Sequence, residues 1–147
     1  MAHAYTKSHV HIIFSTKARE KQINKELQPK LWSYMAGICR NVNIVALAIG
    51  GIEDHVHALV ELPPAMALSK AINLLKSNSS RWMREQGIEF AWQEGYGAFN
   101  VSASNVAAVR EYVLNQEAHH KKMTFEQEFV AFLKKHGIQF DPKYVLG

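Results

Sequence analysis

Two segments of the chain, residues 9–16 and 55–62, alternate apolar side chains with others, and each begins with a His-X-His pattern. Successive side chains of a β-strand point to opposite faces, so this alternation predicts two strands that each bury one face. Pro63 and Pro64 follow the second segment and end it, because proline cannot donate to a sheet ladder. Any fold of this chain must therefore place two pairs of histidines on the strands of a sheet.

Two further strands are expected. Residues 44–49 form a continuous apolar run, which is typical of a buried strand, and Gly50 with Gly51 predicts a turn directly after it. Residues 96–102 predict a short strand that is preceded by glycines.

Two helices are predicted in the long intervals between these strands. Apolar residues recur every three or four positions in residues 24–42 and again in residues 67–86. Asn24 is the expected N-cap of the first of these helices.

Two more helices are expected near the end of the chain. Ser104 predicts the start of a helix that runs to about residue 123. Thr124 and Gln127 match a capping box, which predicts a last helix that ends at Gly137. Residues 138–147 are expected to form an extended edge segment.

The predicted order is β-α-β-β-α-β followed by two helices, which indicates an α+β, ferredoxin-like fold within a single domain of residues 1–147. In that topology the first and third strands are central neighbours, so the two histidine pairs lie on adjacent strands. The first two helices cover one sheet face, and the other face is expected to be free for a site.

Composition excludes several classes of protein. The chain has 147 residues, 48% of them apolar, which is enough to bury a core and excludes disorder as the main state. One cysteine excludes an intrachain disulfide and a cysteine-based zinc site. Two aspartates argue against an all-carboxylate metal cage. No apolar run is long enough to span a bilayer, and the first residues lack a signal-peptide layout, so we expect a cytoplasmic protein with no membrane partner.

Six of the eight histidines come in close pairs. His55 and His57 lie two residues apart on a predicted strand, so both imidazoles point the same way and could hold one cation. Two polar residues on a solvated strand face are the alternative interpretation. His9 and His11 have the same spacing, and spacing alone does not separate the two pairs. Asp54 precedes the second pair, where its carboxylate could orient an imidazole.

Tyr112 and Gln116 lie one helical turn apart and share a face of a predicted helix, and His119 with His120 follows on much the same side. A tyrosine can attack phosphorus if a cation polarises the target, and a glutamine carbonyl can complete a metal's ligand set. A core tyrosine with a polar edge is the alternative.

Basic residues indicate a polyanionic partner. The net charge is +4, and Lys70, Arg81 and Arg84 share one helix face, which could track a nucleic-acid backbone together with Lys17 and Arg19. A solvated helix face explains the first three equally well.

Over nearly its whole length, the chain resembles the single-tyrosine, HUH-type transposases of small bacterial and archaeal insertion sequences, the IS200-like and REP-associated group. The match begins at residues 11–17 (HIIFSTK) and runs to the last helix. Its four most specific blocks, in chain order, are residues 54–60 (DHVHALV), 75–81 (LKSNSSR), 92–97 (WQEGYG) and 101–102 with 112–120 (YVLNQEAHH).

This resemblance implies a function and a site. His55, His57 and Gln116 would hold a divalent cation, Mg²⁺ or Mn²⁺, and Tyr112 would be the nucleophile that cuts and rejoins single-stranded DNA through a 5′-phosphotyrosine link. His11 matches a recurrent histidine of the first strand and is not part of the metal-binding pair. The candidates for DNA contact are the basic residues Lys17, Arg19, Lys76, Arg81 and Arg84.

Members of this family work as dimers on hairpin-forming ends of mobile elements, so the resemblance also implies a homodimer. A short joint at residues 102–104 could let the tyrosine helix swap between subunits, and pairing of edge strands is equally compatible with the sequence. Two other functions compete with the transposase: a non-catalytic, ferredoxin-like nucleic-acid-binding module, and a histidine-rich metal-binding or assembly protein.

Overall fold

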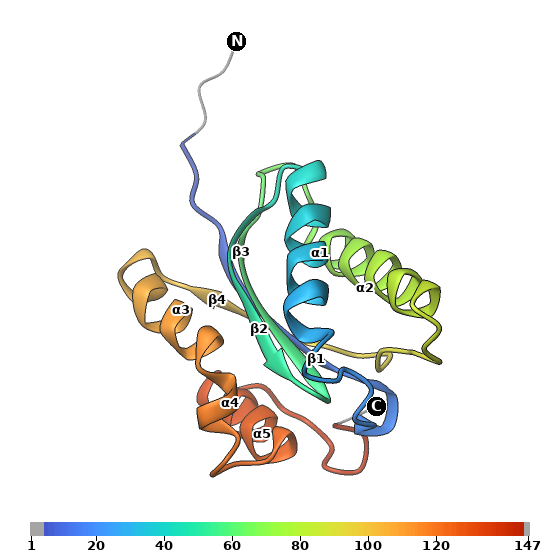
Figure 1. The fold of residues 1–147 in the computed structure, drawn as a ribbon. Coiled ribbons are helices and arrows are strands. Elements are labelled where there is room, and N and C mark those ends of the chain that lie inside the picture. The colour runs from blue at the N-terminus through green and yellow to red at the C-terminus, as the bar shows by residue number, and fades with distance from the viewer. Residues whose placement is uncertain (1–4, 146–147) are drawn as a thin grey trace.

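A four-stranded antiparallel sheet forms the centre of the computed structural model, which describes residues 5–145 (Figure 1). Its strand order is β2-β3-β1-β4, which confirms the ferredoxin-like fold and the central pairing of the first and third strands. The strands are β1 (His9–Ser15), β2 (Val45–Ile52), β3 (His55–Glu61) and β4 (Gly97–Val101). The α-helices are α1 (Gln28–Asn41), α2 (Leu68–Glu85), α3 (Val106–Leu114), α4 (Gln116–His119) and α5 (Phe125–Lys135).

The first layer of helices, α1 and α2, packs on one face of the sheet (Figure 1). Side chains alternate between the two faces of each strand, and this alternation decides which of them contact α1 and α2. Val10, Ile12 and Phe14 of β1 all point into this core, as predicted, and pack with Leu31 of α1 and Leu75 of α2. Each side chain of this size contributes about 1.5–3 kcal/mol when fully buried, so this layer holds the sheet in place.

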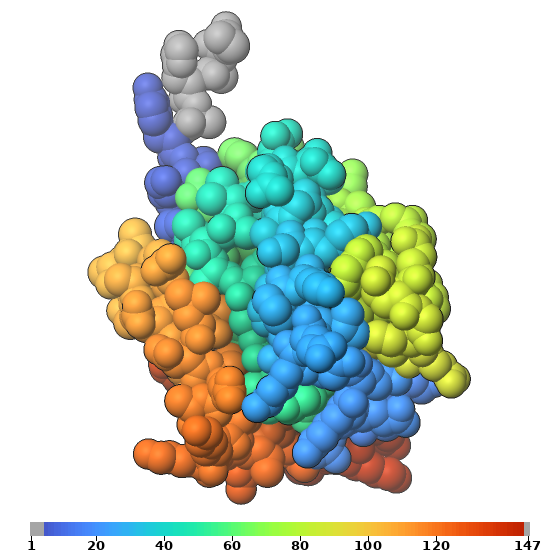
Figure 2. Space-filling view, viewed as in Figure 1, coloured from blue at the N-terminus to red at the C-terminus, as the bar shows by residue number. Residues whose placement is uncertain are grey.

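The other sheet face is covered, which corrects the expectation that it is free. Helices α3, α4 and α5 lie across it (Figure 1). Ile13 and Phe99 pack under Phe125 and Phe129 of α5, and Leu59 packs under Val113 of α3. In Figure 2, the α3–α4 segment (orange) and α2 (yellow-green) lie at opposite sides of the molecule. The odd-numbered face of β1 and β3, histidines included, is therefore enclosed between the sheet and the second helical layer.

Gly50 and Gly51 do not form the predicted turn, because both lie inside β2 and the hairpin turns at Glu53 and Asp54. The reason is the close approach of α3. A Cβ at Gly50 would collide with the carbonyl oxygen of Val113, so glycine at this position lets the helix backbone rest on the strand.

The predicted third helix is interrupted. Residues 103–105 form a 3₁₀ turn, so Ser104 is not the N-cap, and α3 ends where Asn115 leaves the helical conformation (φ −105°, ψ 29°). Asn24 precedes α1 by several residues and accepts a hydrogen bond from the amide of Leu27, so it closes a turn rather than capping the helix.

The capping box of α5 is confirmed, because both of its reciprocal bonds, Gln127 N–H to Thr124 Oγ1 and Thr124 N–H to Gln127 Oε1, are present. The expected edge segment is wrong for residues 138–145, because residues 138–141 are irregular and pair with no strand, and residues 142–145 form a turn. The amide of Lys143 donates to the Asp141 carboxylate in this turn. Residues 146 and 147 lie outside the described residues. No helix among residues 5–145 is long and apolar enough to cross a membrane.

Candidate active site

His55 and His57 enter the site from β3, on the face turned toward α3, α4 and α5, and both side chains are fully buried. Their register explains the placement. His55 pairs with Ser15 and His57 with Ile13 on the neighbouring β1, so both rings rise from the centre of the sheet. The two imidazoles are ring neighbours, with centroids 5.1 Å apart. The strand spacing predicted from the sequence therefore places both rings together.

Donor atoms from three elements converge on these rings. Oε1 of Glu128 on α5 lies 2.8 Å from Nε2 of His57 and 3.5 Å from Nε2 of His55. Nε2 of His120 lies 3.2 Å from the same carboxylate oxygen. One ligand atom from each of His55, His57, His120 and Glu128 lies within 4.8 Å of the others.

Gln116, which the sequence analysis named as a candidate ligand, lies beside this cluster. Its Oε1 lies 3.2 Å from Nε2 of His55 and 3.0 Å from Nε2 of His120. Its amide nitrogen donates to the carbonyl of Tyr112 at 3.0 Å, which leaves the amide oxygen turned toward the imidazoles.

The donor set fits a divalent cation. Metal bonds of about 2.0–2.2 Å place neighbouring ligand atoms about 3.0–3.5 Å apart, and the donor separations of 2.8–3.5 Å are close to that spacing. Imidazole nitrogens combined with amide and carboxylate oxygens suit Mn²⁺ or Zn²⁺ better than Ca²⁺, an ion that takes oxygen ligands only.

Each imidazole is oriented by a partner at its other nitrogen. Asp54 Oδ1 lies 2.8 Å from Nδ1 of His55, which confirms the predicted orienting carboxylate. His11 Nε2 lies 2.8 Å from Nδ1 of His57, and the carbonyl of Met123 lies 2.6 Å from Nδ1 of His120. These contacts aim the Nε2 atoms of all three rings into the cluster.

Burial keeps His57 and the neighbouring His11 neutral, as a metal-binding imidazole must be. Burial lowers the pKa of His57 to about 4, and burial together with the nearby His57 ring lowers the pKa of His11 to about 3. Burial alone would raise the pKa of the Glu128 carboxyl, but hydrogen bonds from His120 and His57 hold that pKa well below its usual range. The site therefore contains a buried anion beside the neutral ring of His57.

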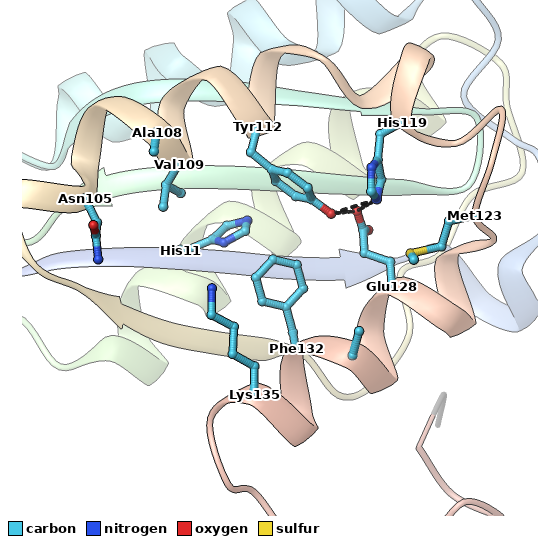
Figure 3. A pocket seen from close by; sticks show the side chains of 11 residues that line it. His11, Asn105, Ala108, Val109, Tyr112, His119, Met123, Glu128, Phe132 and Lys135 are labelled. Atoms are coloured by element: carbon cyan, nitrogen blue, oxygen red, sulfur yellow. Dashed lines mark hydrogen bonds and ion pairs between the residues drawn. The ribbon is translucent and has the colours of Figure 1, made fainter.

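Tyr112 approaches this anion from α3. Its hydroxyl donates to Oε2 of Glu128 and lies 3.0 Å from Nε2 of His119 (Figure 3). Its ring lies 5.7 Å from that of His57, edge to face. Burial, followed by the hydrogen bond to Glu128, raises the pKa of the Tyr112 phenol far above its usual value, so the resting hydroxyl is protonated.

The two histidines of the first pair have different positions. The ring of His11 stacks on that of His57, with centroids 5.0 Å apart, and its centroid lies 5.1 Å from that of Phe132. His11 therefore packs against the site and supports His57. His9 lies at the far end of β1, where its Nε2 is 3.4 Å from Glu61 Oε1, outside the cluster.

A cleft of about 440 Å³ opens beside Tyr112, between α3 and α5 (Figure 3). His11 and Phe132 form its floor and wall, and the Lys135 side chain points into it. A smaller hollow of about 120 Å³ continues past Lys135 to Asn100 and Ser102 at the end of β4. The two depressions together are long enough for an elongated ligand to approach the tyrosine hydroxyl from this side.

The five basic candidates for DNA contact are not gathered on one surface. Lys17 and Arg19 follow β1, and Arg19 lies 3.6 Å from Glu126 on α5, at the border of the site. Arg81 and Arg84 are exposed on α2, in the opposite helical layer.

Lys76 has a structural role in the folded chain. Its ammonium donates to the carbonyls of Gln93, Glu94 and Gly95 at 2.8, 3.2 and 2.6 Å, which uses all three of its protons. Burial lowers the pKa of Lys76 to about 8. Contact with a phosphate would have to replace one of these bonds.

Sequence reasoning missed Glu128 and assigned no role to His120. A signal for Glu128 was present, because an acidic residue stands three positions after Phe125 and directly before Phe129, within the apolar stripe of the last helix. A charged residue is almost never buried without a partner, so an acid at such a position indicates a partner across the packing interface.

Comparison with known proteins identifies the family. The sequence profile described as "Transposase IS200 like" matches residues 4–116. The chain belongs to the IS200-like transposase family. The transposase of insertion sequence element IS200 from Salmonella typhimurium strain LT2 is 29% identical over 124 residues, covering 79% of this chain and 81% of that protein. The IS200 transposase of Salmonella typhi matches equally.

Solved structures share the fold of this IS200-like transposase. A candidate transposase from Deinococcus radiodurans R1 superposes with a TM-score of 0.63 at 23% identity, covering 79% of this chain and 96% of the other. A REP-associated tyrosine transposase bound to a REP hairpin superposes with a TM-score of 0.62 at 15% identity, covering 82% and 73%. The transposase family predicted from the sequence is confirmed.

Proposed function

We propose that this transposase cuts and rejoins single-stranded DNA at the ends of an insertion sequence, with Tyr112 as the nucleophile. The observation that carries the proposal is the position of the Tyr112 ring, 5.7 Å from His57 and at the mouth of a cleft. A tyrosine beside a cation-binding cluster is suited to attack on a phosphodiester.

The reaction is a transesterification. The Oη–P bond of Tyr112 forms while the P–O3′ bond of the DNA breaks, and the phenol proton ends on the departing O3′. The protein thus keeps a 5′-phosphotyrosine link and a 3′-hydroxyl is released. A 3′-hydroxyl of a second strand then attacks the same phosphorus, breaks the Oη–P bond and returns the proton to the phenol. One phosphodiester is exchanged for another, so the bond energy is conserved.

His55, His57 and Gln116 would hold a divalent cation, Mn²⁺ or Mg²⁺. When bound there, such an ion supplies Lewis-acid polarisation of the scissile phosphate. The nitrogen-rich donors suit Mn²⁺ chemically. Asp54 fixes the orientation of His55 through its 2.8 Å contact with Nδ1, and Gln116 links the cluster to the backbone carbonyl of Tyr112.

The DNA partner is supported by charge and by the structural relatives. The REP-associated tyrosine transposase that shares this fold was solved with a REP hairpin, and the present chain has a net charge of +4. Arg19, two residues after Lys17, lies at the border of the site, and Lys135 points into the cleft beside Tyr112. Arg81 and Arg84 would contact DNA that extends beyond the cleaved strand.

A homodimer is part of this proposal. Strands β2 and β4 are the two edges of the sheet, and Val45 at the start of β2 is half exposed, so pairing of edge strands is sterically open. Within a single chain, Tyr112 already reaches the histidine cluster, so this dimer would not need to exchange its tyrosine helices.

A covalent-adduct assay tests the function. The protein is incubated with labelled single strands from the DNA flanking its own gene, with Mn²⁺, Mg²⁺ or a chelator, and resolved on a denaturing gel. We expect a cation-dependent shifted band that Tyr112→Phe abolishes and Tyr96→Phe, a change at an exposed tyrosine, retains. No band from folded protein with any strand or cation would contradict the reaction and favour a binding module that does not cleave.

A further inference from the structure

The reaction described above leaves one buried ionised group of the site without a role. Glu128 is 1% exposed and stands on the apolar side of α5 between Phe125 and Phe129. It lies beyond residues 4–116, which match the family profile. Removing a carboxylate from water costs several kcal/mol unless partners compensate, so this position is tolerated only because of what the carboxylate contacts.

The two oxygens of Glu128 face two different groups. Oε1 is turned to the imidazole cluster, 2.8 Å from His57 Nε2 and 3.2 Å from His120 Nε2. Oε2 accepts the hydrogen bond of the Tyr112 hydroxyl and lies 3.3 Å from His119 Nε2. One side chain thus joins the cation cluster to the tyrosine.

We propose that Glu128 is a ligand of the cation through Oε1 and positions the Tyr112 hydroxyl through Oε2. The positioning half rests on the proposed function, because it gives Tyr112 the role of nucleophile. The ligand half does not, because it concerns the binding of a cation to the protein alone.

Charge and chemistry support the ligand half. His55, His57 and Gln116 are neutral donors, and a divalent cation bound by them alone would keep its full charge inside a buried site. Glu128 adds a negative charge and an oxygen at the point where three Nε2 atoms converge. His120, a fourth member of the cluster, brings a further nitrogen to the same point. A carboxylate among imidazoles is a common ligand set for Mn²⁺, Zn²⁺ and iron(II).

Geometry supports the positioning half. Tyr112 is carried by α3 and Glu128 by α5, and these two helices form opposite walls of the cleft (Figure 3). Because Glu128 is fully buried and bonded at both oxygens, the direction of the tyrosine hydroxyl is fixed relative to the histidines. An attacking oxygen gains rate when its position is fixed before the substrate arrives.

Mn²⁺ binding to the full-length protein, measured by isothermal titration calorimetry without DNA, tests the ligand half. Glu128→Gln is isosteric but uncharged, and we expect it to weaken Mn²⁺ binding by about tenfold or more. Glu126→Gln, at an exposed position of the same helix, serves as the matched control and should leave the affinity within about twofold. Wild-type affinity in folded Glu128→Gln protein would overturn the ligand half.

A spectroscopic signature tests the positioning half. The chain has five tyrosines, and their ¹³Cζ resonances can be labelled selectively. Comparison with Tyr112→Phe identifies the Tyr112 resonance in metal-free protein. We expect Glu128→Gln to move this resonance and to leave the other four in place, whereas Glu126→Gln moves none. An unchanged Tyr112 resonance in Glu128→Gln would overturn the positioning half.

A second variant keeps the proposal testable if the first one misfolds. If Glu128→Gln does not fold, Glu128→Asp keeps the charge but draws both oxygens back by one methylene, and the same two losses are expected. The adduct gel separates this inference from the proposed function. A wild-type protein that forms no adduct while Glu128→Gln still loses Mn²⁺ would refute the reaction and leave the cation ligand established.

Discussion

At the scale of single residues, the absence of one side chain decides how close the tyrosine comes to the histidines. Gly50 pairs with His57 across the β2–β3 ladder, and a Cβ there would collide with the carbonyl oxygen of Val113. Val113 is the residue after Tyr112, so any displacement of this backbone moves the nucleophile. The glycine is therefore as much a part of the site as the polar side chains.

Gly50→Ala is expected to push α3 away from the sheet. The overpacking should lower the free energy of unfolding by about 1–3 kcal/mol, and the yield of covalent adduct should fall further than the loss of folded protein explains. Urea denaturation and the adduct gel measure the two effects.

Gly37→Ala is the matched control, because a Cβ at Gly37 in α1 would meet only the Arg40 guanidinium at 3.8 Å. Alanine is the better helix former by about 1 kcal/mol, so this variant should be slightly more stable and fully active. Equal adduct yields in Gly50→Ala and Gly37→Ala would show that the contact with Val113 does not position Tyr112.

At the scale of elements, the sequence predicts the helices and strands that depend on local patterns. It does not predict features that depend on how the elements pack. The alternating strands and the capping box of α5 were predicted because periodicity and backbone hydrogen bonding act within a few residues. The break after α3 was not predicted, since it involves neither glycine nor proline. Asn115 makes it, with its side-chain amide donating to the Glu111 carbonyl at 2.9 Å. Because of this break, Tyr112 and Gln116 lie on two different short helices, α3 and α4.

The candidate site follows the same division. His55 and His57 could be paired from their strand spacing, whereas the choice between this pair and His9 with His11 needed the family resemblance. Glu128 is 71 residues from His57 in sequence, and only the packing of α5 on the sheet brings the two together. Burial of α5 on the second sheet face was not expected, so no role for its acid could follow.

At the scale of the whole molecule, the distribution of charge makes a prediction about DNA. If the cleaved strand runs along the α3–α5 side, Arg19 at its border and Lys17, two residues earlier in the chain, should contact phosphates. We expect a Lys17→Ala/Arg19→Ala double variant to bind a flanking single strand more weakly. The plot of log affinity against log salt should become shallower by up to about 1.4, since each lost phosphate contact to a single strand contributes about 0.7. Fluorescence anisotropy at several salt concentrations measures it.

The control for this experiment is a double variant of equal charge on the other side of the molecule. Lys30→Ala/Arg40→Ala removes two exposed cations of α1, in the layer that faces away from Tyr112. Its salt dependence should stay near that of the wild type. Equal slopes for the two double variants would mean that only the net charge matters and that the border of the site holds no phosphate.

The stability of the whole molecule should depend on pH through the same buried rings. The pKa of His57 falls from 6.5 to about 4 on folding, and that of His11 falls from 6.5 to about 3. Between these values the unfolded chain binds more protons than the folded one, so stability decreases as the pH falls. The stabilisation is present in full above pH 6.5 and is lost progressively toward pH 3–4. Glu128, whose pKa is lowered, adds loss in the same direction below pH 4.5. His120, whose pKa is raised, stabilises the fold below pH 6.5 and loses this contribution as the pH rises above 6.5.

We therefore expect the urea midpoint of metal-free protein to rise between pH 4.5 and 6.5, where the contributions of His57 and His11 grow to their full value. Above pH 6.5 we expect a small decrease, because the stabilisation from the raised pKa of His120 is lost there. His11→Gln should flatten the rise, since it removes one of the two rings that must stay neutral in the fold. A midpoint that is constant from pH 4.5 to 6.5 would mean that both rings accept protons without cost. In that case the enclosure of the histidines between sheet and helices would not be the dry environment that a cation site of this kind requires.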